Sequence, residues 1–188
     1  MVAVRRLGLS AIVFLVFSVP AVWGCSSAGP YGFSRSYSPL GPEEAALQGS
    51  DHYDPVMAKR LPDEWRSKKL DVFGIVLARG EGREGLADLT LSVRRLAARN
   101  LCEDASEDSC RVTVGDQELA RVHALVKLSQ NDNVGNERVQ PRSLLRVVGK
   151  LEDQANKDDG SDVLLSEFYR HWPAAYFVTE QARSYMKR

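Results

Sequence analysis

Leu144-Leu145-Arg146-Val147-Val148-Gly149-Lys150-Leu151 is the stretch that decides the fold. Aliphatic and β-branched residues dominate it, and Pro141 lies three residues before its start. A short apolar run that follows a turn signal is typical of a buried β-strand. The sequence around this stretch is therefore expected to build a β-sheet.

Other short apolar runs on both sides of this stretch also predict strands. Leu89, Leu91 and Val93 alternate with Thr90 and Ser92, which is the period of a half-buried strand. Further β-rich runs lie at residues 71–78, 111–114, 122–128 and 163–165, with turn-forming clusters at 80–85, 102–110, 131–135 and 158–161. Several short strands with few helices predict a mainly β fold, either a small antiparallel barrel or a sandwich.

The run at residues 139–151 resembles the fourth strand of OB-fold barrels, in which a proline-containing turn leads to an apolar strand that ends in glycine. The resemblance implies strands at 70–79, 86–99, 110–128 and 162–167 as the first, second, third and fifth of a small antiparallel barrel. Residues 129–142 show no clear helix, which departs from many OB-folds. A β-sandwich of the immunoglobulin type is the alternative. A short helix is expected at residues 179–188, which end in a basic turn.

The glycines of Gly80-Glu81-Gly82-Arg83-Glu84-Gly85 match the spacing of a dinucleotide-binding loop. Glu81 and Glu84 would repel the phosphates of such a ligand, and the residues that follow alternate as a strand. We therefore predict a hairpin turn at residues 80–85 and expect no cofactor.

The first residues of the chain resemble a bacterial lipoprotein signal peptide. Arg5 and Arg6 precede an uncharged apolar run at residues 7–19, and Val22-Trp23-Gly24-Cys25 resembles a lipobox, although Trp23 departs from the usual pattern. The resemblance implies cleavage after residue 24, acylation of Cys25 and anchoring in the cell envelope, with Ser26 pointing to the outer membrane. The alternatives are an ordinary secreted protein and an uncleaved anchor.

The rest of the chain divides into a tether and one domain. Residues 25–50 are rich in Ser, Gly and Pro and are expected to form a flexible tether, and residues 51–188 a single β-rich domain. With Cys25 acylated, Cys102 and Cys110 are expected to form a disulfide in an oxidising compartment, the alternative being two free thiols.

Charge and motifs narrow the possible functions. Residues 1–24 carry two arginines, so the mature chain has 23 basic against 25 acidic residues and a net charge of −2. This balance gives no electrostatic case for a nucleic-acid partner. His52, His123 and His171 lie far apart in sequence, and we assign no metal site and no catalytic residues.

Arg170, Trp172 and Tyr176 belong to the densest aromatic cluster of the chain and are a possible binding face. The alternative is that they seal one end of the barrel. We expect a non-enzymatic envelope lipoprotein that binds a protein or glycan partner or supports an envelope assembly. A cell-wall hydrolase with unrecognised catalytic residues is the alternative.

Cys25→Ala tests the lipid anchor. Without its acyl chains the chain loses the apolar area that holds it in the bilayer, at about 0.8 kcal/mol per buried CH₂. We expect an unprocessed or released form on fractionation of cells and mass spectrometry. Unchanged membrane partitioning with an unchanged mass contradicts acylation.

Overall fold

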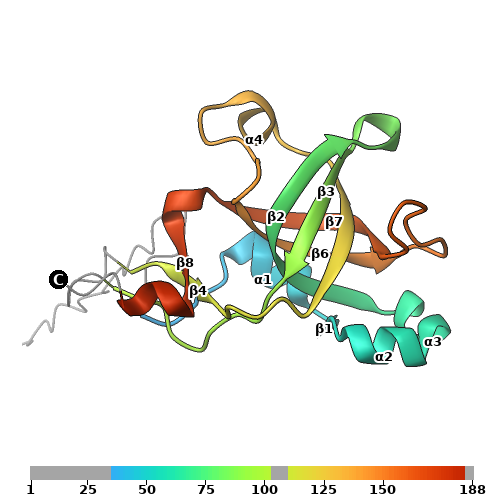
Figure 1. The fold of residues 1–188 in the computed structure, drawn as a ribbon, viewed down its shortest axis with the longest axis horizontal. Coiled ribbons are helices and arrows are strands. Elements are labelled where there is room, and N and C mark those ends of the chain that lie inside the picture. The colour runs from blue at the N-terminus through green and yellow to red at the C-terminus, as the bar shows by residue number, and fades with distance from the viewer. Residues whose placement is uncertain (1–34, 103–109, 185–188) are drawn as a thin grey trace, which may run out of the picture.

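Five strands close into a barrel in the computed structural model, which describes residues 35–102 and 110–184 (Figure 1). They are β2 (Lys69–Glu81), β3 (Ala87–Val93), β5 (Ala120–Val126), β6 (Leu144–Leu151) and β7 (Asp162–Trp172). The strand order is β2-β3-β5-β7-β6, and pairing of β6 with β2 closes it. All of these pairs are antiparallel except β5 with β7. The predicted OB-like barrel is confirmed, and the sandwich alternative is wrong.

The barrel interior is filled by the alternating residues of β3 and its neighbours. Leu89, Leu91 and Val93 are buried there, opposite the apolar residues of β5. Each such side chain contributes about 1.5–3 kcal/mol by leaving water. Strand β6 is buried on both faces, because Leu145 and Val147 point into this core while Leu144 packs into a second one.

The second core lies outside the barrel. A two-stranded parallel sheet of β4 (Val112–Val114) and β8 (Phe177–Thr179) covers Phe73, Leu144 and Trp172. The expected third strand at 110–128 is therefore two strands, β4 and β5, which belong to different sheets. Cys102 and Cys110 precede β4 at disulfide distance, with Cα atoms 3.7 Å apart, as expected.

The glycine-rich segment is a hairpin turn, as predicted. β2 and β3 pair antiparallel up to Glu81 and Ala87, and a 3₁₀ turn at Arg83–Gly85 connects them. Gly85 has φ +75°, a left-handed conformation that glycine adopts without strain. The second barrel strand ends at Val93 rather than at residue 99.

Two helical segments differ from the expectation. A five-residue helix, α4 (Gln130–Val134), lies between β5 and β6, where no clear helix was expected; the Ser129 hydroxyl caps it by accepting a hydrogen bond from the Asp132 N–H. After β8, the described part of the expected C-terminal helix is a 3₁₀ helix at Glu180–Ser184.

None of the helices in residues 35–102 and 110–184 is both long enough and apolar enough to cross a membrane.

The N-terminal part of the described chain packs on the barrel. It comprises α1 (Gly41–Leu47), β1 (Ser50–His52), α2 (Pro55–Arg60) and α3 (Pro62–Ser67), and β1 pairs in parallel with the start of β2. Glu43 of α1 is completely buried. The expected tether at residues 25–50 is therefore wrong in its second half, because the fixed structure begins before α1. The expected lipidation site, Cys25, lies outside the described residues.

Candidate functional site

The predicted binding face is buried. Trp172 has no exposed surface and packs against Phe73, with ring centroids 6.0 Å apart, and Arg170 is also buried. Tyr176 is half-buried and packs against the same second core. These residues therefore do not form an exposed face. They pack between the β4–β8 sheet and the barrel. This position is similar to the alternative interpretation, in which they seal one end of the barrel.

A cluster of buried charges lies beside this aromatic core. Arg146 of β6 and Arg170 of β7 are paired directly across the two strands. Arg146 binds Asp71 of β2 with two hydrogen bonds of 2.7 Å and Glu43 with one of 2.9 Å. Arg170 binds the other carboxylate oxygen of Glu43, Oε2. The Tyr37 hydroxyl donates a hydrogen bond to Oε1, the oxygen that Arg146 also binds.

The pKa shifts in this cluster indicate that its ion pairs stabilise the fold. Burial alone would raise the pKa of Glu43, but the hydrogen bond from Tyr37 and the charge of Arg170 lower it overall. Burial, together with the neighbouring Glu43, raises the pKa of the Tyr37 hydroxyl. Glu43 therefore stays ionised between two arginines, and the cluster fixes the N-terminal segment to β6 and β7.

Three residues distant in sequence form a hydrogen-bonded row at the same end of β6 and β7, where His171 directly follows Arg170. His171 Nδ1 lies 2.9 Å from Asp132 Oδ1, and His171 Nε2 lies 3.1 Å from Ser143 Oγ. This is the order of the groups in a serine hydrolase triad. Sequence analysis missed it because no Gly-X-Ser-X-Gly elbow marks Ser143.

The row is closed to a substrate. Ser143 is 1 % exposed, and its Oγ also accepts a hydrogen bond from the Gln140 N–H. The second carboxylate oxygen of Asp132 accepts hydrogen bonds from the hydroxyls of Tyr169 and Ser129. A nucleophile must approach a substrate atom to about 3 Å, which burial of Ser143 prevents. The row therefore holds the loop that carries α4, residues 128–141 (the α4 loop), onto the barrel.

The same hydrogen bonds perturb Asp132. The hydrogen bond from His171, together with those from Tyr169 and Ser129, lowers the pKa of Asp132 to about 2, against the opposing effect of its burial. At neutral pH Asp132 is therefore ionised, and both of its carboxylate oxygens accept hydrogen bonds. These bonds hold α4 against β7.

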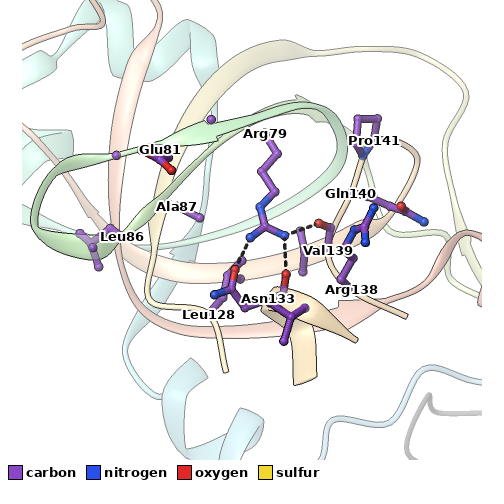
Figure 2. A pocket seen from close by; sticks show the side chains of 14 residues that line it. Arg79, Glu81, Leu86, Ala87, Leu128, Asn133, Arg138, Val139, Gln140 and Pro141 are labelled. Carbon is purple, nitrogen blue, oxygen red and sulfur yellow. Dashed lines mark hydrogen bonds between the residues drawn. The ribbon is translucent and has the colours of Figure 1, made fainter. Parts of the chain in front are cut away.

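A groove of about 890 Å³ lies between the α4 loop and the β2–β3 hairpin (Figure 2). Arg79 of β2 reaches across it and donates hydrogen bonds to the backbone oxygens of Val139, at 2.8 Å, and Asn133, at 3.3 Å, and to the side-chain oxygen of Asn133. The lining combines backbone, amide and charged groups with aliphatic side chains: Gly80, Glu81, Gly82, Leu86, Leu128, Val134, Arg138 and Gln140.

The wall of the groove on the β2 side is a sheet edge. Val76 is the last β2 residue bonded toward β6: its N–H donates to Ser143 O and its oxygen accepts from the Arg142 N–H, both at 2.8 Å. Beyond this point β3 is the only strand of the described residues that pairs with β2. The groove therefore offers backbone donors and acceptors together with an aliphatic floor, which suits binding rather than bond cleavage. Sequence analysis treated residues 80–85 only as a turn and missed the groove.

The outer face of β3 and β5 carries a second histidine, His123, that contacts carboxylates. OB-folds commonly bind oligonucleotides and oligosaccharides on this face. Here His123 lies between two carboxylates, with Nδ1 2.8 Å from Asp88 and Nε2 3.4 Å from Asp159. Sequence analysis missed this pairing, because Asp88 and Asp159 are distant from His123 along the chain.

No family model and no curated protein matches the chain. Among solved structures it is similar to the wild-type single-stranded DNA binding protein from Thermus aquaticus, with 19% identity and a TM-score of 0.28. It is also similar to a deletion mutant of that protein, with 21% identity and a TM-score of 0.29. Both matches cover 54% of this chain and 48% of the other. The chain thus spans about half the length of these solved structures.

This finding corrects the exclusion of nucleic-acid partners, because both similar structures are single-stranded DNA binding proteins. The exclusion rested on net charge, which describes the whole chain and not the distribution of charge over one surface. Arg79 and Arg138, for example, lie together at one groove in a chain of nearly balanced charge.

Asp132→Asn tests the connection between α4 and the barrel. Because the pKa of Asp132 is lower in the folded protein than its ordinary 3.8, its contribution to stability is present above pH 4 and is lost as the pH falls toward 2. Between pH 5 and pH 2 the unfolding free energy of the wild type should therefore fall by about 2 kcal/mol more than that of the variant. Urea unfolding at a series of pH values measures the difference, and parallel pH profiles contradict the assignment.

Proposed function

We propose that this chain is a non-catalytic binding module of the cell envelope, anchored by lipid on Cys25, and that the groove between the β2–β3 hairpin and the α4 loop is its binding site. The observation that carries the proposal is the lining of this groove. Backbone edges, the amides of Asn133 and Gln140 and the aliphatic side chains of Leu128 and Val134 converge there. Such a mixture of apolar surface and a few polar groups is typical of binding sites.

The position of the N-terminal segment supports an envelope partner. Tyr37 is bound to the barrel through Glu43, so eleven residues, 26–36, separate a lipid on Cys25 from Tyr37. A fully extended chain of this length spans at most about 40 Å. A lipid-anchored barrel would therefore stay close to the membrane surface, where its partners are envelope proteins or glycans.

The cell-wall hydrolase remains the second candidate because of one observation, the hydrogen-bonded row of Asp132, His171 and Ser143. It requires the α4 loop to move away from Ser143, which breaks the hydrogen bonds to Asp132 that hold this loop. A serine-reactive phosphonate probe distinguishes the two functions: labelling of Ser143 supports the hydrolase, and its absence in intact envelopes supports the binding module.

Site-specific photo-cross-linking tests the groove as a binding site. Val134 lines the groove and is 69 % exposed, whereas Leu165 on β7 is exposed but lies outside it. Each is replaced in turn by p-benzoylphenylalanine in the full chain, and intact envelopes are irradiated. We expect a discrete adduct from position 134 and little from position 165, measured by gel shift and mass spectrometry. Equal yields at the two positions, or none at 134, contradict the proposal.

A further inference from the structure

We infer that the ligand of this groove is an extended peptide with an acidic side chain, which adds as a strand to the free edge of β2; this inference rests on the proposed function and specifies its ligand. Strand addition to an exposed sheet edge is a common mode of peptide recognition, in which backbone hydrogen bonds supply affinity and side-chain contacts supply specificity. The register of β2 and the charges around the groove carry the argument.

The hydrogen-bond pattern shows which backbone groups of β2 face the groove. Gly82 N–H donates to Leu86 O at 2.8 Å, so the bonded side of Gly82 faces β3. In an antiparallel ladder, alternate residues direct their N–H and C=O groups to the same side. Gly80, paired with Asp88, therefore also faces β3, while Arg79 and Glu81 direct their backbone groups away from it.

On the opposite side of β2, none of the described residues forms a strand at this point. β6 pairs with β2 only as far as Ile75, and the chain before β6 makes its last backbone bonds to Val76. Figure 2 shows that β2 and the segment Val139 to Pro141 lie on either side of the space that Arg79 crosses. Two donors and two acceptors, those of Arg79 and Glu81, thus face a space that a strand can enter by displacing the Arg79 side chain from Val139 and Asn133. Native proteins usually block or cover an exposed strand edge, because its unpaired N–H and C=O groups can pair with another chain. The uncovered edge of β2 is therefore a candidate site for such pairing.

Charge and surface chemistry select the kind of strand. Two guanidinium groups, Arg79 and Arg138, line the groove against one carboxylate, Glu81. Arg138 is exposed and forms no ion pair with a described residue. An acidic side chain on the added strand complements this excess of positive charge, and Leu128 and Val134 can take an apolar neighbour.

A glycan or a nucleic acid matches the groove less well. A glycan has no ladder of alternating amide donors and carbonyl acceptors to pair with Arg79 and Glu81. Single-stranded nucleic acid binds largely by stacking on aromatic rings, and the described groove lining contains none. The peptide is therefore the ligand that uses the free edge, and the other two classes are outcomes of the test.

A matched pair of substitutions at one position tests strand addition. Glu81→Pro removes the outward N–H, which a sheet edge tolerates because this donor makes no ladder bond. Glu81→Ala removes the same carboxylate and keeps the N–H. A displayed library of random octapeptides is selected on the full chain in detergent, and the enriched peptides are measured against both variants.

We expect enriched peptides to be acidic with alternating apolar residues. Glu81→Pro should weaken their binding about tenfold, as expected for the loss of about one backbone hydrogen bond, or 1.4 kcal/mol. Glu81→Ala should bind at least as well as the wild type, and Arg138→Glu, which leaves the backbone intact, should weaken binding by a similar factor. Urea unfolding of each variant verifies that the barrel is folded. Amide hydrogen exchange should show protection of Arg79 and Glu81 in the complex.

Three outcomes overturn the inference: no enriched peptide, equal peptide binding by Glu81→Pro and Glu81→Ala, or exchange protection elsewhere only. A chitotetraose and a single-stranded oligodeoxythymidylate are measured in parallel. If one of these binds at the groove and the peptides do not, strand addition fails while the groove remains a binding site. If no probe binds and the cross-linker at position 134 gives no adduct, the proposed function fails as well.

Discussion

One carboxylate, that of Glu43, makes the arrangement of β6 and β7 possible. Arg146 and Arg170 face each other across these strands and are both buried. Like charges directly opposite in a sheet destabilise it, and a buried ion without a partner costs several kcal/mol. Glu43 accepts hydrogen bonds from both arginines, and Asp71 takes the other side of Arg146. Two cations and two anions thus share one buried site.

The rest of the structure follows from this pairing. Glu43 holds α1 and Tyr37 against the barrel, and Tyr37 in turn packs its ring near Phe73 and Trp172 in the second core. The same two strands carry His171 and, at the start of β6, Ser143, which hold the α4 loop through Asp132. With the loop fixed in this position, the second half of β2 has β3 on one side and a groove on the other. Strands β6 and β7 thus carry the buried charge cluster and also hold the α4 loop, which forms the other wall of the groove beside β2.

The sequence predicted those parts of the fold that depend on local pattern. The alternation of Leu89, Leu91 and Val93 indicated β3, and the glycines after β2 indicated the hairpin, because both signals depend on neighbouring residues. The apolar stretch at 144–151 indicated a buried strand, and the structure explains its lack of alternation by the two cores that it separates.

The parts that the sequence did not predict depend on distant residues. Glu43 lies 103 residues from Arg146 and 127 from Arg170, in a segment whose Ser, Gly and Pro content is typical of a tether. The sequence predicts Trp172 as part of a binding face, because nothing near it in sequence shows that a second sheet covers it. The free edge of β2 depends on where β6 begins, a matter of pairing register that composition does not reveal.

The central claim is that a buried cluster of four charges makes the N-terminal segment part of the domain, and the unfolding free energy of Glu43→Gln tests it most directly. This substitution keeps the size of the side chain but leaves two buried arginines with one anion, so the unfolding free energy should fall by about 3 kcal/mol or more. Glu44→Gln, at the exposed neighbouring position, should change it by less than about 0.5 kcal/mol. Equal unfolding free energies for the two variants would contradict the account.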